Sequence, residues 1–254
     1  MRTLVLNLGN TSLLGGVFRD ERLVKSFRVP IREAATARGF ASLVAARVRG
    51  KVDAAALCSV VPALTDTLSR RVRATFGVTP QLLNAAAPHG LAIGYRRPRE
   101  LGTDRLAAAL GAHTQFPGEN VIVVDCGTAT TVTALRRDGA ILGGAIFPGL
   151  TLWSEALAAR TAQLPRVTPR RPRTALGRSP TEAIASGLFH GHAGAIRELV
   201  QRIRAEVFGR APVRVLGTGG HAPVYAREKL FTELAPDLIL TGLRAFAART
   251  HHHA

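Results

Sequence analysis

The sequence predicts an α/β protein of two duplicated lobes, each built on a mixed β-sheet, facing each other across a central cleft. Two observations lead to this fold class. First, residues 3–20 (TLVLNLGNTSLLGGVFRD) match residues 121–138 (VIVVDCGTATTVTALRRD) at an offset of 118 positions. Second, in both halves short β-rich runs precede helical patterns, as in other α/β lobes. We therefore expect an N-terminal lobe over residues 1–117 and a C-terminal lobe over residues 118–254.

The first half is expected to begin with a three-strand meander, because β-rich runs alternate with polar turns. The third run is LVKSFRV. A helix over 32–50, a buried strand over 53–61 and a second helix over 62–77 are expected next. The second helix has Pro62 in its first turn and Gly77 at its end, which are the usual helix start and stop residues.

The second half repeats this order of elements. Its third strand is expected in AILGGAIF, after a polar turn at Asp138-Gly139. A long helix over 179–209, a strand over 213–220 and a closing helix over 236–250 follow. The two lobes are thus expected to share one topology.

The amino-acid composition bears on whether the protein binds nucleic acid. The formal net charge is +17, and a basic chain can attract nucleic acid. The arginines are spread along the chain, however, and only 5% of the residues are aromatic. The densest basic stretch, 165–178, contains prolines and is expected to be a loop. Nucleic acid is therefore not expected to be the main partner.

Other features of the sequence indicate a cytoplasmic protein. No apolar run approaches the roughly 20 residues of a membrane helix, and the N-terminus lacks a cleavable signal pattern. The two cysteines, Cys58 and Cys126, suggest neither a disulfide framework nor a metal site. The histidines at 251–253 are interpreted as a tag remnant or a frayed tail.

Two turns have the chemistry of phosphate sites. In VVDCGTATT, Gly127 lets the backbone approach a phosphate, exposed N–H groups can form an anion-binding nest, and Asp125 can hold a cation. NLGNTS repeats this design from Asn7. Each turn alone would be compatible with an ordinary hairpin. The two copies at matching positions favour a nucleotide site.

A third motif, LGTDR, opens a helix that is almost entirely Ala and Leu. Asp104 is explained by helix capping, which is the simpler interpretation of this segment taken alone, but capping does not explain Arg105. As a site, Asp104 could accept a proton from a hydroxyl and Arg105 could bind a carboxylate. The glycine turns in LGGAIFPGL and VLGTGGH permit close approach of a ligand but are weak signals.

Taken together, the motifs resemble type III pantothenate kinase, a family of the acetate and sugar kinase, heat-shock chaperone and actin superfamily. Its two lobes are ribonuclease H-like (actin-like ATPase) domains. The stretches that carry the resemblance follow the family's order from residue 4 to residue 243: NLGNTS, LGTDR, VVDCGTATT, GGAIFPGL, TAQLPRV, TEAIASG, GTGG and PDLILTGL.

The resemblance implies ATP-dependent phosphorylation of pantothenate to 4′-phosphopantothenate, the first step of coenzyme A biosynthesis. It also implies Mg²⁺, K⁺ or NH₄⁺, and a homodimer with composite active sites. The residue roles that it implies are Asp104 as general base; Tyr95, Gly102, Thr103, Asp104, Arg105 and Thr181 for pantothenate, with Thr181 reaching across the dimer interface; Asn7, Leu8, Gly9, Asn10, Thr11, Ser12, Leu13, Leu14 and Thr128 for ATP; and Asp125 for the monovalent cation.

One position departs from the family pattern in its chemistry. The family has Asp where this chain has Asn7, so the carboxylate that helps to hold Mg²⁺ is replaced by an amide. Asn7 keeps a carbonyl oxygen and becomes a weakened Mg²⁺ ligand, but it can also donate a hydrogen bond to phosphate. Thr103 and Cys126 also differ from the usual residues, as tolerable packing changes.

Three interpretations stay open at this point. The first is a working kinase that tolerates Asn7. The second is a catalytically impaired paralogue that binds nucleotide or pantothenate as a regulator, a role described for some family members. The third is another superfamily kinase or phosphatase that acts on a different small acid. The intact Asp104, Arg105, Asp125 and Thr181 favour the first.

Overall fold

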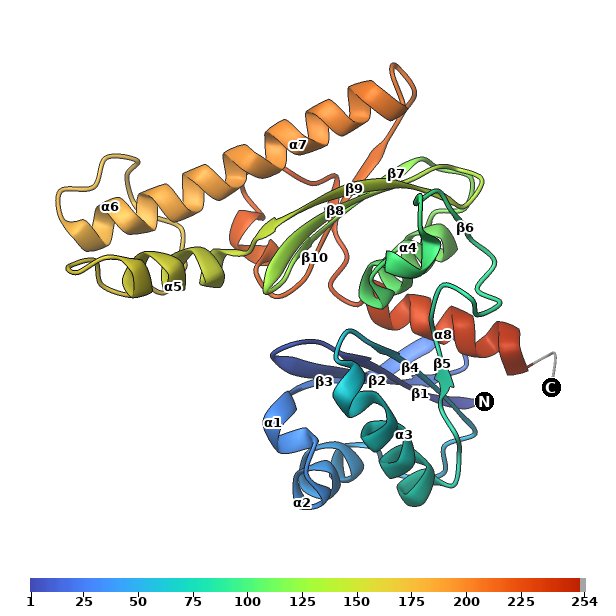
Figure 1. Cartoon of the computed structure of the whole chain (residues 1–254). Coiled ribbons are helices and arrows are strands. Elements are labelled where there is room, and N and C mark those ends of the chain that lie inside the picture. Colours follow the sequence, from blue (N-terminus) through green and yellow to red (C-terminus); the bar gives the residue numbers. More distant parts are fainter. Residues whose placement is uncertain (252–254) are drawn as a thin grey trace. The chain divides into compact units, whose positions relative to one another are not determined.

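The computed structural model describes residues 1–251 and divides into two compact units, which are labelled by element in Figure 1. The first unit is Met1–Pro117 together with the segment from Asp237 onward, and the second is Gly118–Pro236. The last two histidines of the C-terminal run lie outside the described residues. Each unit is described by itself below.

The sheet of the first unit has the strand order β3-β2-β1-β4-β5. The predicted meander is confirmed: each strand pairs antiparallel with the next. The fourth strand, which is parallel to β1, is fully buried in its first five residues, as expected for an interior strand. The bounds are β1 (Arg2–Leu8), β2 (Ser12–Arg19), β3 (Arg22–Pro30), β4 (Ala54–Ser59) and the short β5 (Gln81–Leu82); a further short strand, β6 (Ala92–Ile93), lies outside this five-stranded sheet.

The sheet of the second unit repeats this topology, in the order β11-β10-β7-β8-β9. Its first three strands form an antiparallel meander, and β10 pairs parallel with β7 as β4 does with β1. The expected duplication is therefore present in the strand pairing as well as in the sequence. The bounds are β7 (Val121–Cys126), β8 (Ala129–Leu135), β9 (Ala140–Pro148), β10 (Arg214–Thr218) and β11 (Glu233–Leu234).

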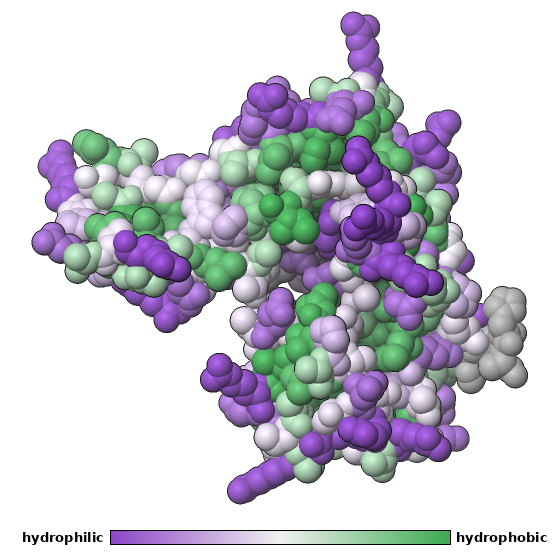
Figure 2. All heavy atoms as spheres, in the orientation of Figure 1, coloured by the Kyte–Doolittle hydropathy of each residue, from purple (hydrophilic) through white to green (hydrophobic). Residues whose placement is uncertain are grey.

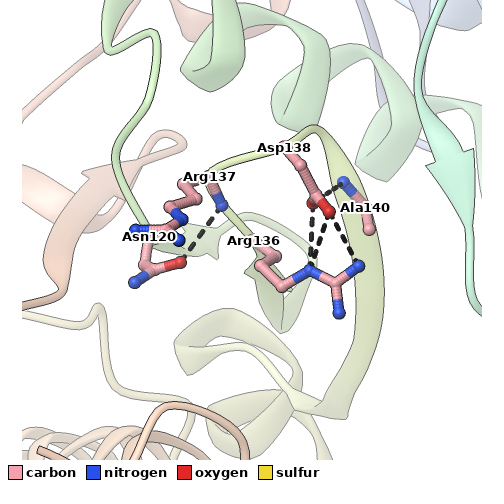
Figure 3. Close-up of polar contacts among 5 residues, drawn as sticks. All are labelled: Asn120, Arg136, Arg137, Asp138 and Ala140. Atoms are coloured by element: carbon pink, nitrogen blue, oxygen red, sulfur yellow. Dashed lines mark hydrogen bonds and ion pairs between the residues drawn. The ribbon is translucent and has the colours of Figure 1, made fainter. Parts of the chain in front are cut away.

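The turn between β8 and β9 shows how local polar groups fix a strand pair (Figure 3). Arg136 forms an ion pair with Asp138, with Nη2 and Oδ2 2.8 Å apart, and Asp138 accepts the backbone N–H of Ala140. The backbone N–H of Arg137 donates to the Asn120 side chain. The Arg136 guanidinium lowers the pKa of Asp138. This ion pair is exposed, so its function is to define the predicted polar turn rather than to add much stability.

The prediction of a single helix over 32–50 is wrong. The segment is helical but broken into α1 (Ile31–Ala34), α2 (Ala37–Gly39), a π-helical turn (Phe40–Val44) and a 3₁₀ turn (Ala45–Arg47). The Thr36 hydroxyl accepts the N–H of Gly39 and starts a new helix there. The chain packs so closely at this break that a Cβ on Gly39 would overlap Glu33 O. By contrast, α3 (Pro62–Phe76) has the predicted Pro start, and Gly77 ends it in a left-handed conformation.

The C-terminal helix α8 (Leu238–His251) belongs to the first unit. It packs against α4 (Thr103–Gln115) and against β1 and β4. From the sequence, this helix is expected in the second lobe, because it follows that lobe in the chain. Its buried apolar face, which includes Leu240 and Leu243, instead completes the core of the first unit.

Helices α4 and α8 cross at two glycines. A Cβ on Gly242 would meet the carbonyl oxygen of Ala107, and a Cβ on Gly111 would meet that of Leu238, both well inside the 3.0 Å that real Cβ atoms keep. The two backbones are therefore in direct contact. This contact accounts for the glycine in each helix interior, where the residue otherwise costs about 1 kcal/mol.

We expect Gly242→Ala to lower the free energy of unfolding by about 2 kcal/mol, because the helix backbones must separate to admit a methyl group. Urea unfolding followed by circular dichroism measures this change. Gly194→Ala in α7 is the control, since its Cβ would meet nothing within 4 Å. An unchanged midpoint for Gly242→Ala would contradict the close crossing.

The long helix predicted over 179–209 is present with a π-helical turn inside it. Ser179 caps α6 (Pro180–Ser186), the π turn spans Gly187–Gly191, and α7 (His192–Val207) completes the run. Helix α5 (Leu150–Arg160) follows the glycine turn after β9, and a 3₁₀ helix (Ala222–Tyr225) follows β10. The basic loop over 165–178 has no regular structure, as expected, and Val167 anchors it to Ser154 of α5.

A buried histidine lies in the core of the second unit. His192 is fully buried, its Nε2 and the Thr130 hydroxyl are 2.8 Å apart, and its Nδ1 and the Tyr225 hydroxyl are also 2.8 Å apart. Its ring stacks on that of Tyr225 at an interplanar angle of 7°. Burial lowers the pKa of His192 to about 4, so the imidazole is neutral at pH 7.

Acid should therefore destabilise the protein through His192. The folded-state pKa lies below the unfolded one, so the unfolded chain binds the proton more tightly, and stability is lost as pH falls from about 6.5 toward 4. We expect a loss of about 2 kcal/mol between about pH 7 and pH 5. Urea titrations at both values measure it for wild type, His192→Gln and the exposed control His190→Gln. An equal loss in His192→Gln and wild type would contradict this assignment.

On the face drawn in Figure 2, hydrophilic and apolar side chains alternate over short distances. Among the helices of residues 1–251, none combines the length and the apolar character needed to cross a bilayer.

Candidate functional site

The first predicted phosphate turn connects β1 and β2. The N–H of Gly9 donates to Ser12 O at 3.0 Å, which closes a tight turn and leaves Asn10 and Thr11 exposed. The Arg28 guanidinium donates to the Ser12 hydroxyl at 2.9 Å. The turn therefore presents polar side chains and a cation at one end of the sheet. Leu8 and Leu13 are buried, so only their backbone is available to a ligand.

Asn7 lies at the end of β1, opposite Cys58 of β4 in the parallel register. The buried Cys58 thiol donates a hydrogen bond to Asn7 Oδ1, with 3.2 Å between sulfur and oxygen. The amide oxygen that the sequence analysis considered as a weakened Mg²⁺ ligand is thus engaged with the protein.

The end of β4 is joined to the start of α4. The Thr103 hydroxyl donates to Ser59 O at 2.8 Å and accepts the Ser59 N–H at 3.1 Å. The N-cap position is Gly102, where a Cβ would lie only 2.8 Å from Asp104 Oδ1. These contacts fix the first turn of α4, which carries Asp104, to the strand beside β1.

Asp104 is a half-buried carboxylate in the first turn of that helix. Its Oδ1 accepts the N–H of Arg105 at 2.7 Å. Burial raises the pKa of Asp104, while that N–H and the Arg105 charge act in the opposite direction. The N-cap residue of α4 is Gly102, which has no side chain, and Asp104 accepts a first-turn N–H instead, so stabilisation of the helix start accounts for part of its role. A carboxylate with a raised pKa is a candidate general base.

Arg105 is buried with only 5% of its surface exposed, which is unusual for an arginine. Its Nη1 donates to the Tyr95 hydroxyl, and its guanidinium carbon lies 5.5 Å from the centre of the Tyr95 ring. The structure thus places Tyr95 beside Arg105 of the LGTDR motif. A buried guanidinium next to a tyrosine hydroxyl is suited to binding a carboxylate.

In the second unit, three glycine turns meet at one end of the sheet. Gly219 follows β10 with φ +85°, and a Cβ there would overlap Asp125 Oδ1 at the end of β7. Gly149 follows β9, donates to Thr128 O at 3.0 Å and packs against Gly127 O. The weak glycine signals of the sequence are therefore parts of one constellation around the DCGT turn.

Asp125 is the candidate cation ligand of this constellation. It is half-buried, and a carboxylate oxygen is the ligand type that hard cations prefer. No cluster of three or more His, Cys, Asp or Glu side chains that could hold a metal occurs within residues 1–251. The residues thus fit a cation held by one carboxylate together with substrate phosphates and water, as in many kinases.

Thr181 is exposed on the first turn of α6, after the Ser179 cap. Within the second unit it lies on a different element from Asp125 and Thr128. Cys58 and Ser59 were not selected from the sequence. Their place beside Asn7 follows only once β4 is known to pair parallel with β1.

Comparison with known proteins identifies the family. A family model described as type III pantothenate kinase matches residues 3–202. A curated type III pantothenate kinase of Legionella pneumophila (strain Corby) is 38% identical over 250 residues, which cover 96% of this chain and 97% of the relative. A protein named type III pantothenate kinase 1 of Francisella tularensis subsp. holarctica (strain OSU18) is 36% identical over 245 residues, 94% of this chain and 96% of the relative.

Solved structures support the fold alone. A conserved putative Baf family transcriptional activator from Campylobacter jejuni superposes with a TM-score of 0.64 at 19% identity and covers 98% of this chain and 99% of its own. A putative N-acetylmannosamine kinase from Listeria monocytogenes superposes with a TM-score of 0.54 at 12% identity, covering 99% of this chain and 100% of its own. The two mixed sheets thus have the expected actin-like ATPase architecture.

Proposed function

The chain belongs to the type III pantothenate kinase family, and on that premise we propose that it phosphorylates pantothenate with ATP to give 4′-phosphopantothenate, the first step of coenzyme A biosynthesis. The observation that supports this most directly is the half-buried Asp104, with its raised pKa, beside the buried Arg105. Neither residue is explained by helix capping or core packing alone.

In the proposed reaction, Asp104 accepts the proton of the pantothenate hydroxyl. The hydroxyl oxygen attacks the terminal phosphorus of ATP, a new O–P bond forms, and the bond from that phosphorus to the ADP oxygen breaks. The Ser59–Thr103 contacts hold the base in position. Positioning of this kind is the main protein contribution to phosphoryl transfer.

Arg105 and Tyr95 are proposed to bind the carboxylate of pantothenate, with Gly102 and Thr103 lining the same place. The Arg105–Tyr95 hydrogen bond orients the guanidinium before substrate arrives. A pre-oriented guanidinium loses less entropy on binding. The Thr103 hydroxyl is already engaged by Ser59, so we assign it a positioning role first.

Segment 7–14 and Thr128 are proposed to bind ATP, and Asp125 to hold K⁺ or NH₄⁺. Mg²⁺ bound to the phosphates would neutralise charge that develops during transfer. The exposed turn at Asn10-Thr11 and the close packing of Gly149 and Gly219 against the turn that follows β7 support these assignments, because glycine backbone lets a ligand approach closely.

A homodimer with composite sites is proposed on two observations. Thr181, for which a pantothenate contact across the dimer interface is expected, is exposed on the first turn of α6. The second unit also exposes large apolar side chains, which a self-association surface would cover: Ile146, Leu152, Leu157 and Leu176. Two experiments test this assembly. Sedimentation equilibrium measures the oligomeric state. Mixing Asp104→Asn protomers with Thr181→Ala protomers restores activity only if the two residues act in one shared site.

The experiment that tests the function is ATP-dependent phosphorylation of pantothenate by the purified protein with Mg²⁺ and K⁺, followed by mass spectrometry of the product. Turnover by wild type supports the proposal. Turnover by Asn7→Asp but not by wild type would support the alternative, a catalytically impaired paralogue that binds nucleotide or pantothenate as a regulator. If neither wild type nor Asn7→Asp phosphorylates pantothenate, the kinase function is contradicted.

A further inference from the structure

Residue 7 offers two different groups to a ligand, and its orientation decides which one is presented. An asparagine side chain carries an oxygen, which accepts hydrogen bonds and binds cations, and an NH₂ group, which donates to anions. The two groups occupy opposite corners of one planar amide. A partner that takes the oxygen therefore turns the NH₂ group away from itself.

Cys58 is that partner in this chain. The thiol donates to Asn7 Oδ1 at 3.2 Å, and the parallel register of β1 and β4 places the two residues opposite each other. The Cys58 side chain is 1% exposed, so it is held by the core and is not free to rotate away. Burial also raises the pKa of its thiol, with a further contribution from the nearby Asp104 charge, which keeps it a hydrogen-bond donor.

The NH₂ group of Asn7 is left free to bind a ligand. Among the hydrogen bonds of residues 1–251, none is made by Asn7 Nδ2, and this nitrogen is not one of the buried polar atoms without a partner. It is therefore accessible to solvent. It stands directly before the turn in which the Gly9 N–H closes on Ser12 O and Arg28 contacts Ser12.

We propose that Cys58 is a positioning residue that makes residue 7 a hydrogen-bond donor to a phosphate oxygen rather than an oxygen ligand of a cation. The inference rests on the proposed function only in taking the first turn as a nucleotide phosphate site. Its consequence is a nucleotide site whose affinity depends weakly on divalent metal. Because its amide is neutral, Asn7 does not repel the triphosphate, as the carboxylate of an aspartate at this position would.

The test measures ATP affinity by isothermal titration calorimetry on the full-length protein, in EDTA and in excess Mg²⁺. Wild type and Cys58→Ser, whose hydroxyl can replace the thiol donor, should bind ATP in EDTA with similar affinity. Cys58→Ala should bind ATP about 5-fold more weakly in EDTA, because the amide is free to turn. Asn7→Asp should bind about 10-fold more weakly in EDTA and recover in Mg²⁺, because a carboxylate repels uncomplexed phosphate.

A second measurement reports on the hydrogen bond itself. The infrared S–H stretch of Cys58 is assigned as the band that disappears in Cys58→Ala. This band should shift in Asn7→Ala, because the thiol loses its acceptor. The S–H band of Cys126 should stay unchanged and serves as an internal reference. This readout and Asn7→Asp keep the proposal testable should Cys58→Ala fold poorly.

The outcomes separate this inference from the proposed function. If the protein phosphorylates pantothenate but Cys58→Ala and Asn7→Asp bind ATP in EDTA as wild type does, the positioning role of Cys58 is overturned and the kinase assignment stands. If ATP binds neither with nor without Mg²⁺ and pantothenate is not phosphorylated, both are overturned.

Discussion

Asp104→Asn is expected to lower kcat for pantothenate phosphorylation by about 10²–10⁴-fold, the usual contribution of a positioned general base. The amide keeps the shape of the carboxylate but cannot accept the hydroxyl proton. ATP affinity and the thermal midpoint should stay at or above their wild-type values, because burial already disfavours the charged carboxylate at this place. Steady-state kinetics and calorimetric titration with ATP measure the two effects separately.

The pH dependence provides an independent check on the same residue. Burial raises the pKa of Asp104, and the reaction requires the ionised form. As pH falls through that raised pKa, the base becomes protonated and kcat/KM declines, at a pH where an ordinary aspartate would still be ionised. Asp66→Asn on the exposed face of α3 is the matched control and should change neither kcat nor the profile. If Asp104→Asn retains half of the wild-type kcat, the assignment of Asp104 as the general base is contradicted.

Gly219→Ala is expected to lower kcat/KM for ATP by about 100-fold, the effect of a displacement of about 1 Å in a catalytic site. A Cβ at this position would overlap Asp125 Oδ1 and would lie 2.7 Å from the Cys126 carbonyl carbon. The backbone of Gly219 also has φ +85°, a left-handed conformation that alanine adopts only with strain. The turn that carries Asp125 must therefore move.

The neighbouring Gly220→Ala is the control for Gly219→Ala. A Cβ on Gly220 would meet nothing within 4 Å, so both the turn and the activity should be preserved. Steady-state kinetics at varied ATP and K⁺ concentrations compare the two variants, and circular dichroism confirms that both are folded. Equal activities of the two alanine variants would show that the Gly219 turn does not position a functional group.

Much of the fold was predictable because its signals are local. Alternation of apolar residues specified the two meanders, and Pro62 and Gly77 marked the ends of α3. The strand repeat predicted one topology for both halves, which the strand pairing confirms. The helix expected over 32–50 failed, because a helical apolar spacing does not reveal that Thr36 caps a new helix within it.

The candidate site was predictable to the extent that its residues are close in sequence. LGTDR and Tyr95 lie within eleven residues of each other, and the structure brings their side chains together. Cys58 could not be chosen in this way, since it is 51 residues from Asn7. Its place depends on which strand pairs with β1 and in which register, which is decided by burial of both strand faces.

The amino-acid sequence alone thus specified the two strand meanders, their turns, the starts of α3 and α6 and the identity of the chemical groups, because these follow from short-range periodicity and from the conformational limits of proline and glycine. Only the tertiary structure decided that α8 completes the first unit, that the glycine turns converge on Asp125, and that a thiol takes the oxygen of Asn7. Each of these depends on contacts between distant segments, and such contacts form where they bury the most apolar surface while keeping polar groups hydrogen-bonded.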